Sequence, residues 1–569
     1  MKLDGSQSEP TPTLGLVGPG DLWYKDAVVY SLNVETYQDS NDDGIGDFPG
    51  LTSRVDYLHA LGITCIWLAP FYVSPNRDNR YDVADYYAID SRLGSLGDFV
   101  DFLRVARERG IRVMIDLVAN HTSDQHPWFV SAQSSVDSPY RDYYIWSERL
   151  PENSDEGMVF PGAETSTWSR SDETGAYYFH RFYRHQPDLN LGNPRVREEI
   201  RKIMGFWLEL GVSGFRLDAA PFLIERKGVL SQNGEARRPH TFFRYMRGFL
   251  SWRRGDAALL AEANVAMDEV SEYVGTGDKL QLLFNFWWNQ HFWLAMATRD
   301  ARPLAQAIDE LATLPPTCQW ANFLRNHDEL DLGRLSPPAR RAAYDAFAPD
   351  ANMRAYDRGI RRRMASMLGG DRARRELAHS LLLAMSGTPV LYYGDEIGMG
   401  DELSLREREG VRTPMQWSNA MNGGFSRAPE GELVRPLVRD GGFSPAHLNV
   451  AEQQRDPSSF LNWLQRAIGV RKKCRELSWG RTEALASNNA SVLIVRCGWQ
   501  NAVLVTVHNL SAEPQSVHLD SAFVQSGDER PIEMFSDREY EEWPGRGAPL
   551  FVAAYGYRWL RTASVSLLP

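Results

Sequence analysis

The chain alternates short apolar runs with amphipathic stretches, and this order constrains its fold more than any other feature. An apolar run bounded by turn residues is typical of a strand in a parallel sheet, which is buried on both faces. Between such runs, hydrophobic residues recur at helical spacing, as at Leu51, Val55, Leu58 and Leu61 before the stop at Gly62. Eight apolar runs occupy residues 28–33, 63–69, 111–118, 214–218, 258–262, 281–286, 320–324 and 389–393. We therefore predict an α/β fold, a (β/α)8 TIM barrel with its helices outside the strands.

Several segments interrupt this alternation and divide the chain. Residues 121–190 are rich in aromatic residues, Ser and Pro, and are too long for an ordinary loop, which predicts a small domain inserted after the third strand. A charged, helix-like segment predicts a helical lid inserted after the seventh strand, and a change to short strands predicts a C-terminal β-sandwich. The expected units are a disordered N-terminus (1–20), the first part of the barrel (21–120), the inserted domain (121–190), the second part of the barrel with its lid (191–478 and 329–372) and the β-sandwich (479–569).

Composition limits the partners that the chain can have. Its 62 Lys and Arg residues against 74 Asp and Glu residues give a net charge of −12, and no basic stripe stands out, which argues against a nucleic-acid partner. The N-terminus lacks the apolar core of a signal peptide, and no apolar run approaches membrane-spanning length. The four Cys residues have neither metal-ligand nor redox-pair spacing, which favours a reducing compartment. We expect a soluble, cytoplasmic protein with no membrane partner.

Polar residues follow several of the predicted strands at the point where each strand ends. Arg216 and Asp218 share one face of the fourth strand, and this pair taken alone is as compatible with a structural ion pair as with a functional site. However, Asp116 closes the third strand, Glu262 the fifth and Asp328 the seventh. The carboxyl ends of all strands in such a barrel meet at one face, so we predict that Asp218, Glu262 and Asp328 converge there.

Three converging carboxylates suit the cleavage of a glycosidic bond. One carboxylate must be ionised to attack the anomeric carbon, and a second must be protonated to release the leaving oxygen. Arg216 next to Asp218 favours the ionised form, which suits a nucleophile, whereas Glu262 stands between two alanines and suits the acid/base. Asp328 is then available to stabilise oxocarbenium-like charge or to orient sugar hydroxyls. Spacing along the sequence does not by itself fix these roles.

The stretches around these residues resemble the four signature regions of the α-amylase family (glycoside hydrolase family 13), at residues 116–121, 214–219, 262–264 and 326–328. The resemblance covers roughly residues 21–475. It implies a retaining mechanism with Asp218 as nucleophile, Glu262 as acid/base and Asp328 as transition-state stabiliser. It also implies that the sugar is bound by Tyr81, Asp82, His121, Arg216, His327 and Arg412.

Longer stretches resemble one group within this family, the maltose–trehalose isomerases known as trehalose synthases. These stretches are residues 120–129, 180–190, 318–330, 359–363 and 390–401. The resemblance implies that a glucosyl enzyme forms in a closed site, and that the released glucose turns over and attacks through another hydroxyl. Maltose, trehalose and glucose are then the expected small-molecule partners, with side hydrolysis to glucose, and a lid that excludes water belongs to the mechanism.

Two departures from that group keep other functions open. Arg80 stands where the group usually has glycine, and residues 283–290 differ from its usual sequence. Both positions are expected to reshape the acceptor side of the sugar site, so an α-glucosidase or a transglucosylase with another acceptor is the alternative. A non-catalytic binding protein of the same fold is a remote alternative, because such a protein is expected to lose carboxylates that this chain keeps. A homo-oligomer assembled through the C-terminal domain is a further expectation.

Two calcium sites are predicted, one of them from the residues themselves. The loop 39–47 places oxygen donors at alternate positions with glycines between them, which suits Ca²⁺, although Gly50 excludes a helix–loop–helix calcium hand and a simple polar turn is the alternative. Its candidate ligands are Asp39, Asn41, Asp43, Ile45 and Asp47. The family resemblance implies a second site made by Asn120, Asp188 and Glu225. Either ion would hold a loop in place and do no chemistry.

Overall fold

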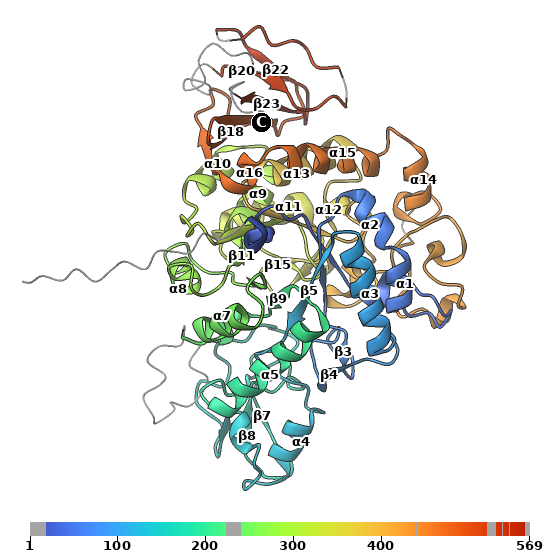
Figure 1. The fold of residues 1–569 in the computed structure, drawn as a ribbon, viewed down its shortest axis with the longest axis vertical. Coiled ribbons are helices and arrows are strands. Elements are labelled where there is room, and N and C mark those ends of the chain that lie inside the picture. Colours follow the sequence, from blue (N-terminus) through green and yellow to red (C-terminus); the bar gives the residue numbers. More distant parts are fainter. Residues whose placement is uncertain are drawn as a thin grey trace, which may run out of the picture.

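The computed structural model describes residues 19–223, 241–439, 441–519, 531–537, 539–545 and 547–563. Eight parallel strands close into a barrel, which confirms the predicted fold class (Figure 1). Around the barrel the strands follow chain order, and the last strand pairs with the first. They are β1 (Val29–Leu32), β2 (Cys65–Leu68), β5 (Arg112–Leu117), β9 (Gly214–Leu217), β10 (Ala258–Ala261), β11 (Leu282–Phe284), β12 (Gln319–Phe323) and β16 (Thr388–Tyr392).

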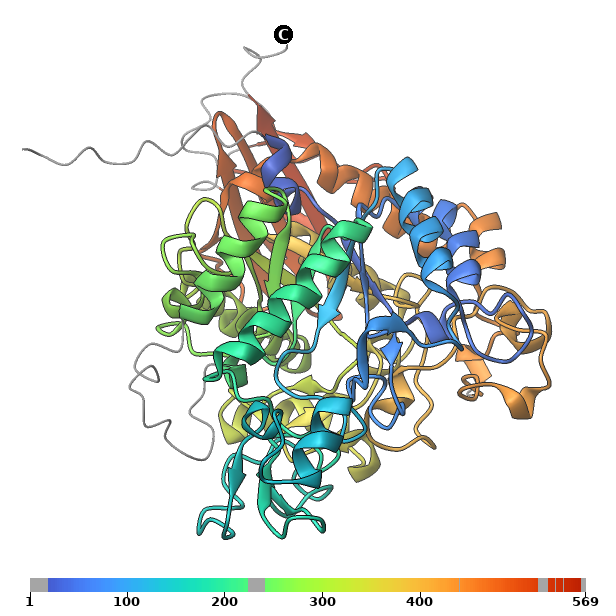
Figure 2. The ribbon, with the colours of Figure 1, turned by 60° about the horizontal axis from the view of Figure 1, so that its bottom comes forward.

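Helices follow the strands and lie outside the barrel in both views (Figures 1 and 2). The longer ones are α3 (Leu96–Glu108), α5 (Pro194–Leu210), α7 (Thr241–Arg253), α9 (Phe286–Thr298), α10 (Arg302–Asp309), α13 (Arg372–Ala384) and α15 (Phe460–Lys473). Their ends follow local chemistry. Ser95 and Asp98 form a reciprocal capping box at the start of α3, and Gly211 ends α5 in the left-handed region at φ 117°.

The predicted helix over residues 51–61 is two helices in the structure, α1 (Phe48–Ser53) and α2 (Val55–Leu61). Arg54 separates them because its backbone leaves the helical region, with ψ near 2°. Its guanidinium turns to Gln38, with Nε 2.8 Å from Oε1, and stacks 4.1 Å from the centre of the Trp417 ring. A tertiary contact thus interrupts a pattern that is periodic in sequence.

The aromatic segment after the third strand folds as a small unit. It contains α4 (Pro127–Ser134) and a three-stranded sheet in the order β6 (Trp146–Ser147), β8 (Tyr177–Phe179), β7 (Trp168–Arg170). Phe129 lies at its centre, 4.9 Å from the Tyr144 ring and 5.0 Å from the Tyr178 ring. A backbone bridge between His121 and Asp188 ties its beginning to its end, so one compact unit leaves and rejoins the barrel at a single place.

The segment after the seventh strand was predicted to be helical, but it is only partly so. It contains α11 (Pro337–Phe347) and α12 (Met364–Met367), but also a small sheet in the order β13 (Leu330–Asp331), β15 (Gly359–Ile360), β14 (Arg354–Ala355). The hairpin of β14 and β15 reaches the inserted unit. There Arg358 Nη1 donates to the Val159 carbonyl at 2.7 Å, and the Tyr356 ring lies 4.8 Å from the Phe160 ring.

The C-terminal part of the chain forms two antiparallel sheets that pack on each other. One has the order β17 (Arg481–Leu485), β18 (Val492–Trp499), β19 (Ala502–Asn509), β23 (Tyr557–Ala563), β21 (Ile532–Glu533); the other pairs β20 (Gln515–Val517) with β22 (Leu550–Val552). Val505, Val517 and Val552 belong to one buried cluster between them. These sheets and the inserted unit lie at opposite ends of the molecule (Figure 2).

Within the described residues, every helix is too short or too polar to span a membrane.

Candidate active site

The candidate site lies where strands β5, β9, β10 and β12 end. Gly214 permits close pairing of β9 and β10, because a Cβ there would lie 2.2 Å from the carbonyl oxygen of Ala258. The resulting register sets Leu217 opposite Ala261, so Asp218 and Glu262, the next residue of each strand, leave the sheet side by side. The structure thus brings together carboxylates that the sequence separates by dozens of residues.

Arg216 is the centre of this arrangement. Its guanidinium is fully buried and contacts three carboxylates, with Nη1 2.5 Å from Asp116 and 2.7 Å from Asp218, and Nη2 2.8 Å from Glu262. The Trp67 ring covers it at 5.0 Å. A buried cation with this many acceptors fixes all of their positions, because moving any one of them leaves a charge without its partner.

The protonation of Asp218 differs from what the sequence led us to expect. Burial raises the pKa of Asp218, Arg216 opposes this, and the carboxylates of Glu262 and Asp116 add to it, so the pKa of Asp218 stands well above its ordinary value. The expectation that Arg216 favours the ionised form of Asp218 is therefore wrong in its net effect: Arg216 lowers the pKa, but burial and the neighbouring carboxylates outweigh it. The same guanidinium is ion-paired with three carboxylates, so it offsets the charge of Asp218 less than it would if it were paired with Asp218 alone.

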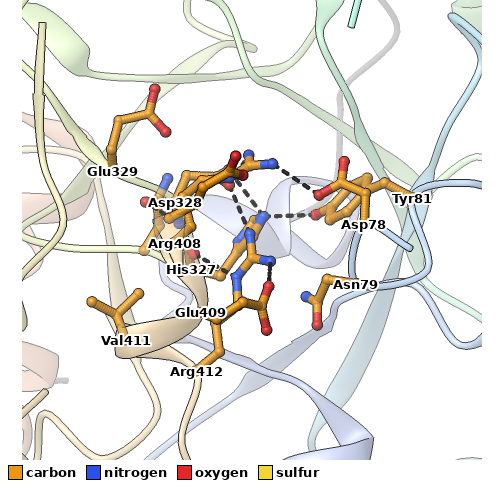
Figure 3. Close-up of polar contacts among 12 residues, drawn as sticks. Asp78, Asn79, Tyr81, His327, Asp328, Glu329, Arg408, Glu409, Val411 and Arg412 are labelled. Carbon is orange, nitrogen blue, oxygen red and sulfur yellow. Dashed lines mark hydrogen bonds and ion pairs between the residues drawn. The ribbon is translucent and has the colours of Figure 1, made fainter. Parts of the chain in front are cut away.

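On the other side of the site, Tyr81, His327 and Asp328 are in direct contact (Figure 3). The Tyr81 and His327 rings stack with centroids 5.4 Å apart, and the Tyr81 hydroxyl lies 2.8 Å from His327 Nε2. His327 Nε2 is also 3.0 Å from Asp328 Oδ2. Tyr81 also links the two halves of the site, because its hydroxyl accepts a hydrogen bond from Arg216 Nη1 at 3.2 Å.

Asp328 is surrounded by cationic groups. Arg408 Nη1 lies 2.6 Å and Arg412 Nη2 3.0 Å from its Oδ1. Although burial opposes the effect, His327 and Arg408, followed by Arg412, hold the pKa of Asp328 well below its ordinary value. Asp328 is therefore an anion at neutral pH.

Two residues of the site were missed by the sequence analysis, Asp78 and Arg408. Arg408 Nη2 lies 2.8 Å from Asp78 Oδ1 while Nη1 contacts Asp328, so Arg408 joins these two carboxylates (Figure 3). Their only signal in the sequence was position, since Asp78 precedes Tyr81 by three residues and Arg408 precedes Arg412 by four. Nothing in the sequence pairs two residues that are 330 positions apart.

Two residues that were expected beside the sugar, Asp82 and Arg80, make their contacts elsewhere. Asp82 is fully buried, and its oxygens accept hydrogen bonds from Ser74 Oγ at 2.8 Å and from the Arg77 amide at 3.1 Å, so it holds its own loop together. Arg80 is buried and ion-paired with Glu35 and Asp90, so it does not reshape the acceptor side directly.

His121 contacts the inserted unit, and the stretch 283–290 contacts the segment after β12. His121 is buried, with its ring 5.1 Å from the Phe182 ring of the inserted unit. In the divergent stretch, Gln290 Nε2 donates to Asn264 Oδ1 at 3.4 Å, and its Oε1 accepts from the Arg334 amide at 3.0 Å. Arg334 belongs to the segment after β12, and Asn264 is two residues beyond Glu262. Gln290 therefore joins the segment after β12 to the end of strand β10.

The candidate calcium ligands are placed in part. The loop 39–47 closes on itself: the Asp39 carboxylate accepts from the Asn41 amide at 3.0 Å and from the Gly44 amide at 2.8 Å, and Asp43 accepts from Ile45 at 2.9 Å. The described residues contain no group of three or more His, Cys, Asp and Glu side chains arranged to hold a metal. At the second site Asn120 Nδ2 lies 3.1 Å from Asp188 Oδ2, and the third candidate, Glu225, lies outside the described residues.

Comparison with known proteins identifies the family. The α-amylase catalytic domain matches residues 32–336 and 356–480. A trehalose synthase from Pimelobacter sp. is 39% identical over 559 residues, which is 96% of this chain and 97% of that one. A trehalose synthase/amylase from Mycolicibacterium smegmatis is 40% identical over 555 residues, 95% of this chain and 92% of that one. A crystal structure of the trehalulose synthase MutB superposes with a TM-score of 0.76 at 27% identity, covering 95% and 100% of the two chains. The chain therefore belongs to the α-amylase family.

Proposed function

We propose that the chain transfers an α-glucosyl group with retention and isomerises maltose to trehalose, with some hydrolysis to glucose. The observation that carries this proposal is the placement of Asp218 and Glu262 on one buried guanidinium, with the anionic Asp328 opposite them. Paired carboxylates with a third anion nearby suit cleavage through an oxocarbenium-like transition state. The near full-length similarity to proteins named trehalose synthase supports the choice of maltose and trehalose as substrates.

In the proposed reaction Asp218 attacks the anomeric carbon of the non-reducing glucose while Glu262 protonates the departing glycosidic oxygen. The products of this step are a glucosyl ester on Asp218 and a free glucose. That glucose turns over, and its anomeric hydroxyl attacks the anomeric carbon of the glucosyl ester. Glu262 takes up the proton and the Asp218 carboxylate departs, which gives trehalose and restores both side chains. Asp328 stabilises the positive charge of both transition states, and Arg216 keeps the two reacting carboxylates in place.

The proposed sugar contacts come from both sides of the site. The Tyr81 ring, which stacks on His327, offers an apolar face to the sugar. The Asp78–Arg408 pair offers both an acceptor and a donor for sugar hydroxyls, and Arg412 offers a second donor next to Asp328. We assign His121 to the same sugar on the family resemblance alone.

Three segments meet over Arg408 in a way that supports isomerisation over hydrolysis. Glu407 Oε2 accepts hydrogen bonds from Tyr183 of the inserted unit at 2.5 Å and from Tyr356 of the β14–β15 hairpin at 2.9 Å. The Phe160 ring lies 4.6 Å from the Tyr183 ring and 4.7 Å from the Arg408 guanidinium. We propose that these contacts between the three segments limit the access of water to the glucosyl enzyme, because water is the competitor that diverts it to glucose.

The second candidate function is that of an α-glucosidase or transglucosylase. The name of the Mycolicibacterium smegmatis relative includes amylase as well as trehalose synthase, so we test this function too. Product analysis on maltose, trehalose and sucrose separates the candidates. We expect trehalose to be the main product from maltose, and maltose the main disaccharide from trehalose. Mainly glucose, or longer oligosaccharides, would instead assign the chain to the second function.

We also propose one structural calcium ion in the loop 39–47. The loop supplies only hard oxygen donors and carries four carboxylates with no Lys or Arg among them, which suits Ca²⁺. Calcium should raise the apparent unfolding temperature by about 5 °C, because the ion binds only the folded loop. Thermal melts with EDTA, Ca²⁺ or Mg²⁺ test this on the whole protein. A calcium response equal in the Asp39→Asn variant, or none in the unmodified protein, would rule the site out.

A cytoplasmic location is proposed as well. Its support is that Cys65, Cys318, Cys474 and Cys497 are all buried free thiols, which fit a reducing compartment. The homo-oligomer stays a prediction.

A further inference from the structure

Arg80 occupies a backbone conformation that favours glycine, yet it is a buried arginine. Its φ is +66°, in the left-handed region, and the preceding Asn79 is at +49°. Its side chain is 1% exposed. A residue that tolerates both an unfavourable backbone and the burial of a charge needs partners that compensate for them.

The partners of Arg80 form an unbroken line of alternating charges that leads to the site. Arg80 Nη1 pairs with Glu35 Oε2, and Glu35 Oε1 pairs with Arg435. Arg435 Nε pairs with Glu409 Oε2. Glu409 Oε1 then lies 2.8 Å from Arg412 Nη1, and Arg412 Nη2 lies 3.0 Å from Asp328 Oδ1. The order of this ionic chain is Arg80, Glu35, Arg435, Glu409, Arg412, Asp328.

Further hydrogen bonds and an ion pair hold the ionic chain in place at its Arg80 end. Arg80 Nε lies 3.2 Å from Asp90 Oδ2, and Asn76 Nδ2 donates to Glu35 Oε2 at 3.1 Å. Arg435 Nη2 donates to Asn79 Oδ1 at 3.3 Å. Residues 76–80 are thus held at three points, and they are the residues that precede Tyr81.

Burial makes the links of the ionic chain interdependent. Glu35 is fully buried, and although burial raises its pKa, Arg80 and Arg435 hold the pKa of Glu35 below its ordinary value. If Arg80 lost its charge, Glu35 would depend on Arg435 alone and draw it away from Glu409. Glu409 would then compete with Asp328 for Arg412, because each anion in a low-dielectric interior seeks the nearest cation.

We propose that Arg80 is a positioning residue for Asp328, acting through the ionic chain and not through contact with the sugar. The inference rests on the proposed role of Asp328 in glucosyl transfer. It accounts for an arginine in a backbone conformation that favours glycine: here the orientation of Arg412 is set from the far side of the 76–80 loop.

The test compares Arg80→Gly with a matched control. Glycine removes the charge and relieves the backbone at φ +66°, so this variant is expected to fold. We expect kcat to fall about tenfold with little change in KM, for both maltose and an aryl α-glucoside. The control is Arg92→Gln, since Arg92 pairs with the same Asp90 at 2.9 Å but is 42% exposed and is not a link of the ionic chain. Its kcat should stay at the unmodified value, and Arg80→Lys should recover part of the loss.

A double-mutant cycle separates positioning from simple stabilisation. Arg435→Gln breaks the ionic chain in the middle, so Arg80→Gly should lower kcat no further in that background. Fully additive losses of kcat, or an Arg80→Gly variant as active as Arg92→Gln, would overturn the proposal. Release of the aryl group reports on glucosyl transfer whatever the acceptor. If maltose gives no trehalose, the proposed isomerase function fails while this test still stands.

Discussion

Replacing Asp218 by Asn will lower glucosyl transfer about 10⁵-fold, the size of effect expected when a nucleophile is removed. Asn has nearly the same shape as Asp and can still accept from Arg216 Nη1, which lies 2.7 Å from the Asp218 oxygen. The amide cannot form the glucosyl ester, so no covalent intermediate accumulates. Steady-state rates with maltose and with an aryl α-glucoside measure the loss.

The matched control for this variant is Asp256→Asn. Asp256 is also an aspartate that two arginines hold, with Arg112 at 2.5 Å and Arg254 at 3.0 Å, but it precedes β10 and therefore lies at the opposite end of the barrel. It should lose stability without losing kcat. If Asp218→Asn keeps its activity on both substrates, the assignment of the nucleophile is wrong, and with it the mechanism.

Replacing Glu262 by Gln will affect substrates according to their leaving groups. With maltose the departing alkoxide needs a proton, so we expect a loss of about 10³-fold in kcat/KM. A nitrophenolate leaves without protonation, so the first step with an aryl α-glucoside should be slowed far less. Presteady-state release of the nitrophenol, followed by slow turnover, measures the difference directly.

The site geometry makes this comparison clean. Glu262 Oε2 accepts from the Ala219 amide at 3.2 Å and pairs with Arg216 Nη2 at 2.8 Å, and the oxygen of Gln can keep both contacts. Equal losses on the two substrates would mean that Glu262 supports the site without transferring a proton. The acid would then be another group, and Asp328 is unsuited to that role because its cationic neighbours hold its pKa well below the ordinary value.

The barrel and the three converging carboxylates were predictable because both depend on local rules. A strand buried on both faces is apolar along its length, which makes β2 or β10 visible as a continuous run. Parallel strands present their carboxyl ends at one face, so Asp218, Glu262 and Asp328 could be placed together without knowing any distance. The roles within the cluster were less secure, because Arg216 proved to serve Asp116 and Glu262 as well.

The loops were not predictable in the same way. Asp78 and Asp82 are four residues apart on one loop, and only tertiary contacts decide that Asp78 meets Arg408 while Asp82 caps its own turn. Arg80 was expected to reshape the acceptor side, but it is buried and paired with Glu35 and Asp90. For Asp78 the deciding partner, Arg408, lies 330 residues away and carries no periodic signal.

The central claim, that glucosyl transfer is intramolecular, is tested most directly by incubating the protein with maltose and an excess of isotope-labelled free glucose. A site closed over the glucosyl enzyme should return the released glucose before it escapes. We predict that trehalose becomes the main product and carries almost no label. Trehalose labelled in proportion to the free glucose, or free glucose as the main product, would contradict the account.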